Sequence, residues 1–196
     1  MDIDNVQFWN KIYDSGNMAW GNTVSTFLEE VEPMLSKGCK ILDLGCGNGR
    51  NSASLDSKGF DVTGLEFSHS AIEQAKNRCN AKFIQEDLIN SDNWTSEVVD
   101  VIIDFGFYHF YPADHRVRYL KNVNRILKKG GLYINESGRW ADPSLFAGEY
   151  VPPQLFKEDF DIFENFEKVI FRESVLPPVA LGNWGEYPCW QMVLRK

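Results

Sequence analysis

Residues 40–51 read KILDLGCGNGRN, and this stretch decides the fold. A short apolar run that carries one acid, Asp43, passes directly into alternating glycines at positions 45, 47 and 49. The apolar run predicts a buried strand, and the glycines predict a tight turn that leads into a helix. Glycine adopts positive φ without steric cost and lets a ligand lie against bare main chain. The stretch therefore predicts a ligand site where a strand turns into a helix.

The spacing of the glycines and the acid before them restrict the ligand. Gly45, Gly47 and Gly49 form a G-x-G-x-G pattern, whereas the dinucleotide-binding fingerprint is G-x-G-x-x-G. Asp43 would repel a phosphate group at the mouth of the turn, but it suits a ligand that carries an ammonium group. Both features argue against a nicotinamide dehydrogenase, which is the second interpretation of this turn.

Apolar runs and helical patterns alternate along the chain as far as residue 136. The apolar runs predict strands at about 39–44, 60–66, 82–86, 98–104 and 132–136. Helices are predicted at about 4–14, 49–57 and 113–128. A further helix is predicted to begin at Ser70, with Glu73 completing a capping box. This alternation predicts an α/β fold of three layers, with helices on both faces of a doubly wound, mostly parallel sheet.

The predicted helix at 113–128 follows Pro112 and has the clearest apolar stripe. The stripe consists of Val117, Leu120, Val123 and Leu127. Gly130-Gly131 comes next and is predicted to end the helix.

The alternation stops in the C-terminal part of the chain. Residues 138–160 are rich in aromatic residues and prolines, and the runs at 167–174 and 187–195 have no helix between them. Two consecutive strands without a crossover helix must pair antiparallel or lie apart. With 196 residues, the chain is long enough for one domain with a sizeable core.

The D-x-G-x-G-x-G sequence that starts at Asp43 closely resembles motif I of the class I S-adenosylmethionine (SAM) methyltransferases. The resemblance covers residues 36–136 by motif and the rest by topology. It implies a Rossmann-like, seven-stranded sheet into which the last strand inserts antiparallel. It also implies a single domain over residues 1–196, with an N-terminal lid segment (1–35), a cofactor-binding core (36–136), and acceptor-side loops with a closing hairpin (137–196).

The resemblance implies a role for each part of the cofactor site. Asp43 and the glycine turn would hold the methionine portion of SAM, and Cys46 in that turn is interpreted as a small spacer. Glu66 ends the second strand, where a carboxylate can accept hydrogen bonds from both ribose hydroxyls. Asp87 and Leu88 would bind the adenine. The complete implied set is Asp43, Gly45, Cys46, Gly47, Asn48, Gly49, Asn51, Glu66, Phe67, Ser68, Asp87, Leu88, Asp104, Phe105 and Trp20.

Asp104 departs from the family pattern. Asp104 and Phe105 follow the fourth strand, where the chain passes the sulfonium and the methionine. Many relatives have a small residue at the position of Asp104. Its carboxylate could bind an amine or a water in the site, or face the ammonium group of the cofactor, and the sequence leaves these alternatives open.

Methyl transfer needs a positioned acceptor, and it needs a general base only if the acceptor must lose a proton. The chain has three histidines, and His69 and His115 are predicted to lie on the surface. His109 follows the fourth strand and is the predicted base or orienting group. Tyr13 is a second catalytic candidate, because residues 8–21 resemble the aromatic lid of thiopurine and tellurite-resistance methyltransferases.

Composition excludes several partners. A net charge of −8 argues against nucleic acid, and the motif of exocyclic-amine methyltransferases is absent after the fourth strand. The four cysteines contain no C-x-x-C pair, so no metal site is predicted. No run is long enough to span a membrane, and the N-terminus is polar rather than signal-like, so a cytoplasmic protein is expected.

The sequence therefore predicts an enzyme that transfers the methyl group of SAM to a small-molecule nucleophile and releases S-adenosylhomocysteine. Aromatic residues in irregular segments are predicted to border the acceptor, and they suggest an apolar, soft or cationic molecule: Trp140, Phe146, Tyr150, Phe156, Trp184 and Tyr187. The alternatives are a SAM-binding regulatory module without catalysis and an aminopropyl transferase on the same fold. Protein methylation also stays open, and the sequence predicts neither the acceptor nor the oligomeric state.

Overall fold

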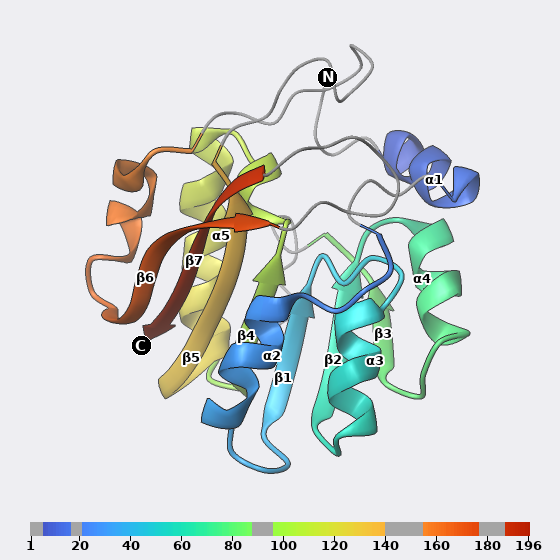
Figure 1. Cartoon of the computed structure of the whole chain (residues 1–196), viewed down its shortest axis with the longest axis horizontal. Helices are drawn as coiled ribbons and strands as arrows, with labels where there is room; N and C mark the ends of the chain where they lie inside the picture. Colours follow the sequence, from blue (N-terminus) through green and yellow to red (C-terminus); the bar gives the residue numbers. More distant parts are fainter. Residues whose placement is uncertain (1–5, 17–20, 88–95, 140–154, 177–186) are drawn as a thin grey trace.

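The computed structural model describes residues 6–16, 21–87, 96–139, 155–176 and 187–196 (Figure 1). Their strands form one seven-stranded sheet with the order β3-β2-β1-β4-β5-β7-β6. The strands are β1 (Lys40–Leu44), β2 (Asp61–Glu66), β3 (Lys82–Gln85), β4 (Val99–Phe105), β5 (Leu127–Gly138), β6 (Glu167–Leu176) and β7 (Tyr187–Arg195). Strands β1 to β5 pair parallel, and β7 inserts antiparallel between β5 and β6. The predicted sheet and its antiparallel last strand are confirmed.

Helices cover both faces of the sheet, as the alternation predicts. The α-helices are α1 (Val6–Ser15), α2 (Thr26–Val31), α3 (Arg50–Ser57), α4 (His69–Lys76) and α5 (Ala113–Ile126). Short 3-10 helices are η1 (Glu32–Met34), η2 (Tyr108–Phe110) and η4 (Lys157–Phe163). Figure 1 shows α2 and α3 in front of the sheet and α5 behind it.

The central strands are buried on both faces, so their side chains alternate between two cores. Leu42 and Ile102 pack with α5 and η4 in one hydrophobic cluster. Ile41 and Val101 pack with α2 and α3 in the other cluster. Burial on both faces explains why these strands read as continuous apolar runs in the sequence.

The start of α4 differs from the prediction. Ser68 is the N-cap, and its Oγ accepts a hydrogen bond from the Ala71 N–H at 3.2 Å. Ser70 lies inside the helix, and Glu73 pairs with Lys76 at 3.0 Å instead of completing a capping box. The helix begins early because the Glu66 carboxylate accepts the N–H groups of residues 67 and 68, which orders the turn before it.

The end of α5 also differs: the helix ends at Ile126, before the predicted residue 128, and Gly130-Gly131 lies inside β5. Val99 pairs with Leu127 and Val101 with Leu132, so the two glycines form part of a bulge. A Cβ on Gly131 would stand 2.8 Å from the Asp100 carbonyl oxygen, which leaves room for glycine alone.

The buried stripe of α5 is shifted from the predicted one. The helix buries Arg116, Tyr119, Val123 and Ile126, whereas Val117 is 49% exposed. Polar partners cause the shift: Tyr119 turns inward to Asp104, and Arg116 turns inward to Asp159.

Arg116 connects α5 to η4 from a buried position. Its Nη1 donates to Asp159 Oδ1 at 2.5 Å, and its Nε donates to the Tyr111 carbonyl at 2.8 Å. The guanidinium also lies 5.5 Å from the centre of the Tyr108 ring. Removing the partner of a buried charge costs far more than removing a solvated pair, because the remaining charge stays desolvated.

Asp159→Ala should therefore lower the free energy of unfolding by about 3 kcal/mol. Glu167→Ala breaks the exposed pair with Arg195 and should cost less than about 1 kcal/mol. Urea unfolding of both variants measures the difference. Equal losses would contradict a stabilising role for the buried pair.

Candidate active site

The site lies at the carboxyl ends of β1, β2 and β4, which are adjacent in the sheet and point to the top of Figure 1. Leu44 pairs with Leu65 on one side and with Asp104 on the other, so the three strands end at the same level. The structure therefore brings the glycine turn, the loop after β2 and the segment 104–110 to one edge. Ligands of open α/β sheets bind at this edge.

The glycine turn has the conformation that its sequence predicts. Gly45, Gly47 and Gly49 all have positive φ, at 64°, 55° and 75°. A Cβ on Gly45 would stand 2.6 Å from the Phe107 ring, and a Cβ on Gly47 would stand 2.4 Å from the Tyr13 hydroxyl oxygen. Both the backbone conformation and the lack of space therefore exclude a side chain at Gly45 and Gly47.

Glu66 ties this turn to the loop after β2. Its Oε2 accepts the Gly47 N–H at 3.2 Å, and its Oε1 accepts the N–H groups of Phe67 and Ser68 at 2.9 Å each. The carboxyl is buried, and desolvation raises its pKa to about 7 although the three N–H groups act to lower it. A carboxylate has about four acceptor positions, so one remains for a ligand hydroxyl.

The other polar residues of the turn are bound within the protein. Asp43 Oδ2 accepts the Ser52 hydroxyl at 2.6 Å, and burial raises the pKa of Asp43 to about 7. Asn48 Nδ2 donates to Asn22 Oδ1 at 2.6 Å. Asn51 Oδ1 accepts the N–H of residue 25 at 3.4 Å. Asn48 and Asn51 thereby connect the turn to the segment before α2.

Cys46 is buried in the turn and fills a space that small neighbours leave. A Cβ on Gly64 would stand 2.7 Å from its sulfur. Burial raises the pKa of the Cys46 thiol well above its ordinary value, so the thiol stays protonated. These properties suit the spacer that the sequence predicts.

Helix α1 lies across the loops after β2 and β4. Trp9 makes a T-shaped contact with Phe110 at 4.8 Å between ring centres and a second one with Phe67 at 6.5 Å. Asn10 Oδ1 accepts the Ser68 hydroxyl at 2.7 Å. These contacts place Phe67 and Ser68 under α1, beside the glycine turn.

Tyr13 of α1 is buried next to Gly47 and Glu66. Burial, followed by the charge of Glu66, raises the pKa of the Tyr13 hydroxyl well above its ordinary value. The group therefore stays protonated and suits hydrogen bonding rather than proton removal.

Four further predicted cofactor residues are Trp20, Asp87, Leu88 and Phe105. Trp20 and Leu88 lie outside the described residues. Asp87 is half-buried just after β3. Phe105 packs its ring 6.3 Å from Phe27 of α2, so its side chain belongs to a core cluster.

Asp104 binds protein groups rather than facing an open site. Its Oδ2 accepts the Tyr119 hydroxyl at 2.5 Å and the Tyr133 hydroxyl at 3.2 Å. Its Oδ1 accepts the N–H groups of Phe107 and Tyr108 at 2.9 and 3.2 Å. Burial raises the pKa of Asp104 to about 6. The carboxyl thus fixes the turn that carries His109.

The polar cluster around Asp104 is the feature that sequence reasoning missed. Asn135 Nδ2 donates to the Tyr133 hydroxyl at 3.1 Å, and the Ser137 hydroxyl donates to Asn135 Oδ1 at 2.8 Å. A signal was present, because residues 133, 135 and 137 place polar groups on one face of an otherwise apolar strand.

His109 lies between the loops after β4 and β5. Its Nδ1 accepts the Gly138 N–H at 3.3 Å, so the ring proton belongs on Nε2. Burial, followed by the nearby charge of Arg116, lowers the pKa of His109 to about 3. A neutral imidazole with this tautomer is a hydrogen-bond donor and a weak base. Of the other histidines, His69 is exposed as predicted and His115 is partly buried.

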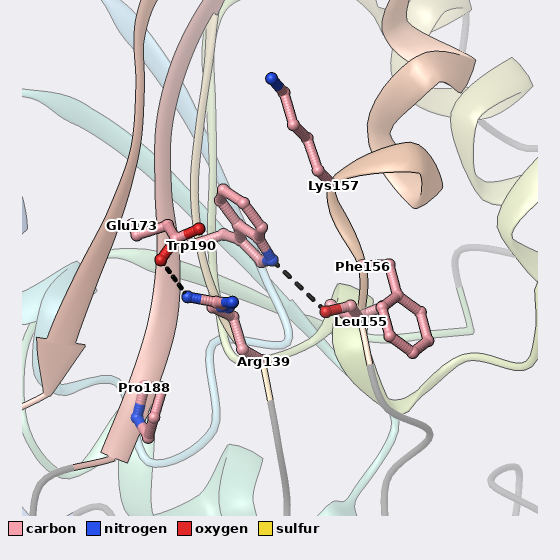
Figure 2. Close-up of a pocket in the computed structure, with 7 residues that line it drawn as sticks. All are labelled: Arg139, Leu155, Phe156, Lys157, Glu173, Pro188 and Trp190. Atoms are coloured by element: carbon pink, nitrogen blue, oxygen red, sulfur yellow. Dashed lines mark hydrogen bonds and ion pairs between the residues drawn. The ribbon is translucent and has the colours of Figure 1, made fainter.

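A pocket of about 350 Å³ includes Arg139, which directly follows the Gly138 that donates to His109. It is lined by Arg139, Leu155, Phe156, Lys157, Glu173, Pro188 and Trp190 (Figure 2). Phe156 is one of the aromatic residues predicted near the acceptor, whereas Trp190 was not predicted there. Trp140, Phe146, Tyr150, Trp184 and the side chain of Tyr187 lie outside the described part of the chain.

The described ranges contain no group of three or more His, Cys, Asp or Glu side chains that could hold a metal ion. Among the helices of the described segments, none has the length and apolar character needed to cross a membrane.

The residues that form much of this site match a known family model. Residues 41–131 match the family model described as a methyltransferase domain. The chain is 27% identical over 135 residues to "Probable thiol methyltransferase 2" of Arabidopsis thaliana, covering 64% of this chain and 59% of that protein. It is 28% identical over 138 residues to human "EEF1A lysine methyltransferase 2", covering 64% and 55%. It therefore spans less than two thirds of each of these curated relatives.

Solved structures show the same fold. A SAM-dependent methyltransferase from Methanosarcina mazei superposes with a TM-score of 0.73 at 20% identity, covering 89% of this chain and 98% of the other. A TehB-like SAM-dependent methyltransferase from Corynebacterium glutamicum gives 0.66 at 24% identity, covering 97% and 95%.

The buried carboxyls predict how stability depends on pH without cofactor. Asp43 and Glu66 have pKa values of about 7 in the folded protein and about 4 when unfolded. The folded state therefore holds protons that the unfolded state releases between these values. The stabilisation of the folded state by these bound protons is complete below about pH 4 and is lost as the pH rises through 7.

Glu66→Gln keeps a neutral group in place and should show a smaller fall in unfolding free energy between pH 5 and 8. Urea unfolding across this range measures the slope. Glu73→Gln, on the exposed face of α4, is the control and should keep the native slope. A native slope in Glu66→Gln would contradict the raised pKa.

Proposed function

We propose that the chain transfers the methyl group of SAM to a small-molecule nucleophile and releases S-adenosylhomocysteine, because residues 41–131 match a methyltransferase domain and the fold is that of SAM-dependent methyltransferases. The observation that carries this proposal is the juxtaposition of the bare glycine turn with two buried carboxyls, Asp43 and Glu66. SAM carries an ammonium group, a sulfonium and two ribose hydroxyls. Carboxyls beside bare main chain are complementary to such a ligand.

The residues present fit this cofactor. Gly45 and Gly47 leave backbone that a side chain would otherwise cover, and Glu66 has an acceptor position left for ribose. We assign Asp43 to the methionine end, Glu66 to the ribose, and Asp87 with Leu88 to the adenine. Phe67 would flank the adenine ring, and Tyr13 and Trp20 would cover the cofactor from the N-terminal segment. In this proposal residues 36–136 bind the cofactor and residues 137–196 border the acceptor.

SAM supplies an electrophilic methyl group when it is bound, so the protein has to hold the acceptor in line with that group. His109 is positioned for this task by its bond to Gly138 and by the Asp104 cluster under its turn. Its Nε2–H would donate to the acceptor atom or a neighbouring atom and orient it. Gly106 leaves space beside the ring, since a Cβ there would stand 3.5 Å from His109 Cε1.

The pocket favours a small molecule as the acceptor. The relatives include a probable thiol methyltransferase and a lysine methyltransferase of EEF1A, so they do not choose between a small molecule and a protein as the acceptor. A volume of about 350 Å³ suits a small molecule. The link of this pocket to His109 through Gly138 and Arg139 favours an enzyme over a module that binds SAM without catalysis. An aminopropyl transferase loses its support, because the carboxylate that would bind the amine, Asp104, is occupied by protein donors.

S-adenosylhomocysteine should bind the native chain, and Glu66→Ala should weaken binding about tenfold to a hundredfold, as expected for one charge-assisted group. Isothermal calorimetry measures both. Glu73→Ala removes an exposed glutamate from the next helix and should bind like the native chain. No heat with native protein would overturn the proposed function.

His109→Ala should lower kcat about tenfold to a hundredfold with little change in KM for SAM, and His109→Asn should restore part of the loss because it keeps a donor. The acceptor for this assay would come from a screen of thiols, phenols and carboxylates for S-adenosylhomocysteine production. Since the His109 pKa is about 3, its protonation should leave kcat unchanged between pH 6 and 8. A step near pH 6.5 that His109→Asn abolishes would instead indicate a base.

A further inference from the structure

The pocket in Figure 2 has a mixed chemical character, and its position connects it to the proposed reaction. Arg139 directly follows Gly138, whose N–H donates to His109. Arg139 also lies at the carboxyl end of β5, where its N–H donates to the Pro188 carbonyl at 2.8 Å. The pocket is therefore linked to His109 through the adjacent residues Gly138 and Arg139.

Arg139 lies over an aromatic face. Its guanidinium carbon lies 4.8 Å from the centre of the Trp190 ring, and the Trp190 Nε1 donates to the Leu155 carbonyl at 3.4 Å. Figure 2 shows the guanidinium between Glu173 and the indole. Because the indole is fixed by this bond and by burial, the planar donor set of Arg139 is presented in a defined orientation.

The partner of Arg139 is easily displaced. Glu173 accepts a hydrogen bond from Arg139 Nη1, and its side chain is 61% exposed. Exposed ion pairs contribute little to stability, so exchanging Glu173 for another carboxylate costs little. Among the described residues, Glu173 is the only acceptor of the guanidinium, which leaves N–H groups for a bidentate carboxylate.

The pocket is locally positive in an acidic protein. Arg139 and Lys157 against Glu173 give one net positive charge, whereas the chain carries −8. In the described segments Lys157 has no ion-pair partner. Figure 2 shows its side chain extending away from Arg139, so Lys157 serves the outer part of the pocket.

The remaining lining is apolar and flat. Leu155, Phe156, Pro188 and Trp190 surround the charged groups, and Phe156 is 55% exposed. The arginine already covers a face of the indole, so that face does not offer a cation site. This arrangement disfavours the cationic acceptor that the aromatic composition suggests.

We propose that this pocket binds the carboxylate of a small, flat, apolar acceptor, and that Arg139 determines this specificity. The inference rests on the proposed function, because it names the acceptor class of the same site. The carboxylate takes the place of Glu173 on the guanidinium, and the apolar body lies against Trp190 and Phe156.

The test uses 2-naphthoate and its neutral counterpart 2-naphthamide, titrated by calorimetry into the native chain saturated with S-adenosylhomocysteine, and into the chain alone. The acid should bind at least tenfold more tightly than the amide. Arg139→Ala should abolish this preference. Glu173→Gln removes the competing carboxylate and should tighten naphthoate binding twofold to fivefold. Lys37→Ala removes an exposed positive charge before β1, outside the pocket lining, and should leave the affinity unchanged.

Several results would overturn the proposal. They are equal binding of acid and amide, absence of binding by both, an unchanged preference in Arg139→Ala, or weaker naphthoate binding in Glu173→Gln. Thermal melting shows whether Arg139→Ala is folded, and Glu173→Gln decides the question if it is not. Naphthoate binding without any S-adenosylhomocysteine binding would overturn the proposed function and leave the carboxylate pocket standing.

Discussion

The structure depends on the burial of three carboxyl groups at the ends of three adjacent strands. Asp43, Glu66 and Asp104 lie in or at the end of β1, β2 and β4, and each is 4% exposed or less. Burying a charge is costly unless hydrogen bonds replace the lost water. Each carboxyl meets this condition by accepting donors from the loop or helix beside it. The loops of the site are therefore ordered by these three buried carboxyls.

Satisfied hydrogen bonds do not remove the repulsion among these groups. The charges of Asp104 and Glu66 both act to raise the pKa of Asp43, in addition to its desolvation. A cationic ligand relieves such repulsion, whereas an anionic one adds to it. The arrangement explains in physical terms why a glycine turn preceded by an acid suits SAM and not a dinucleotide.

The sequence predicts those parts of the molecule whose signals are local. Apolar runs locate the strands, and the alternating glycines locate the turn, because backbone conformation there depends on neighbours in the chain. The predictions that were wrong concern features that long-range polar contacts determine. Tyr119 faces inward because it reaches Asp104, and α4 begins at Ser68 because Glu66 orders the preceding turn. Hydrophobic periodicity contains no information about such partners.

The proposed acceptor pocket is even harder to predict from sequence patterns, because its contacts join residues that are far apart in the chain. Arg139 and Glu173 are 34 residues apart, and Trp190 and Leu155 are 35 apart, so no spacing motif joins them. Yet the two sides have opposite charge, with carboxyls on β1, β2 and β4 and a net positive pocket at β5 and β7. A cationic cofactor and an anionic acceptor would each be repelled by the other's subsite. Under both proposals, this separation of charge orients the acceptor. Its carboxylate binds Arg139, and its reacting atom points away from Arg139, toward His109.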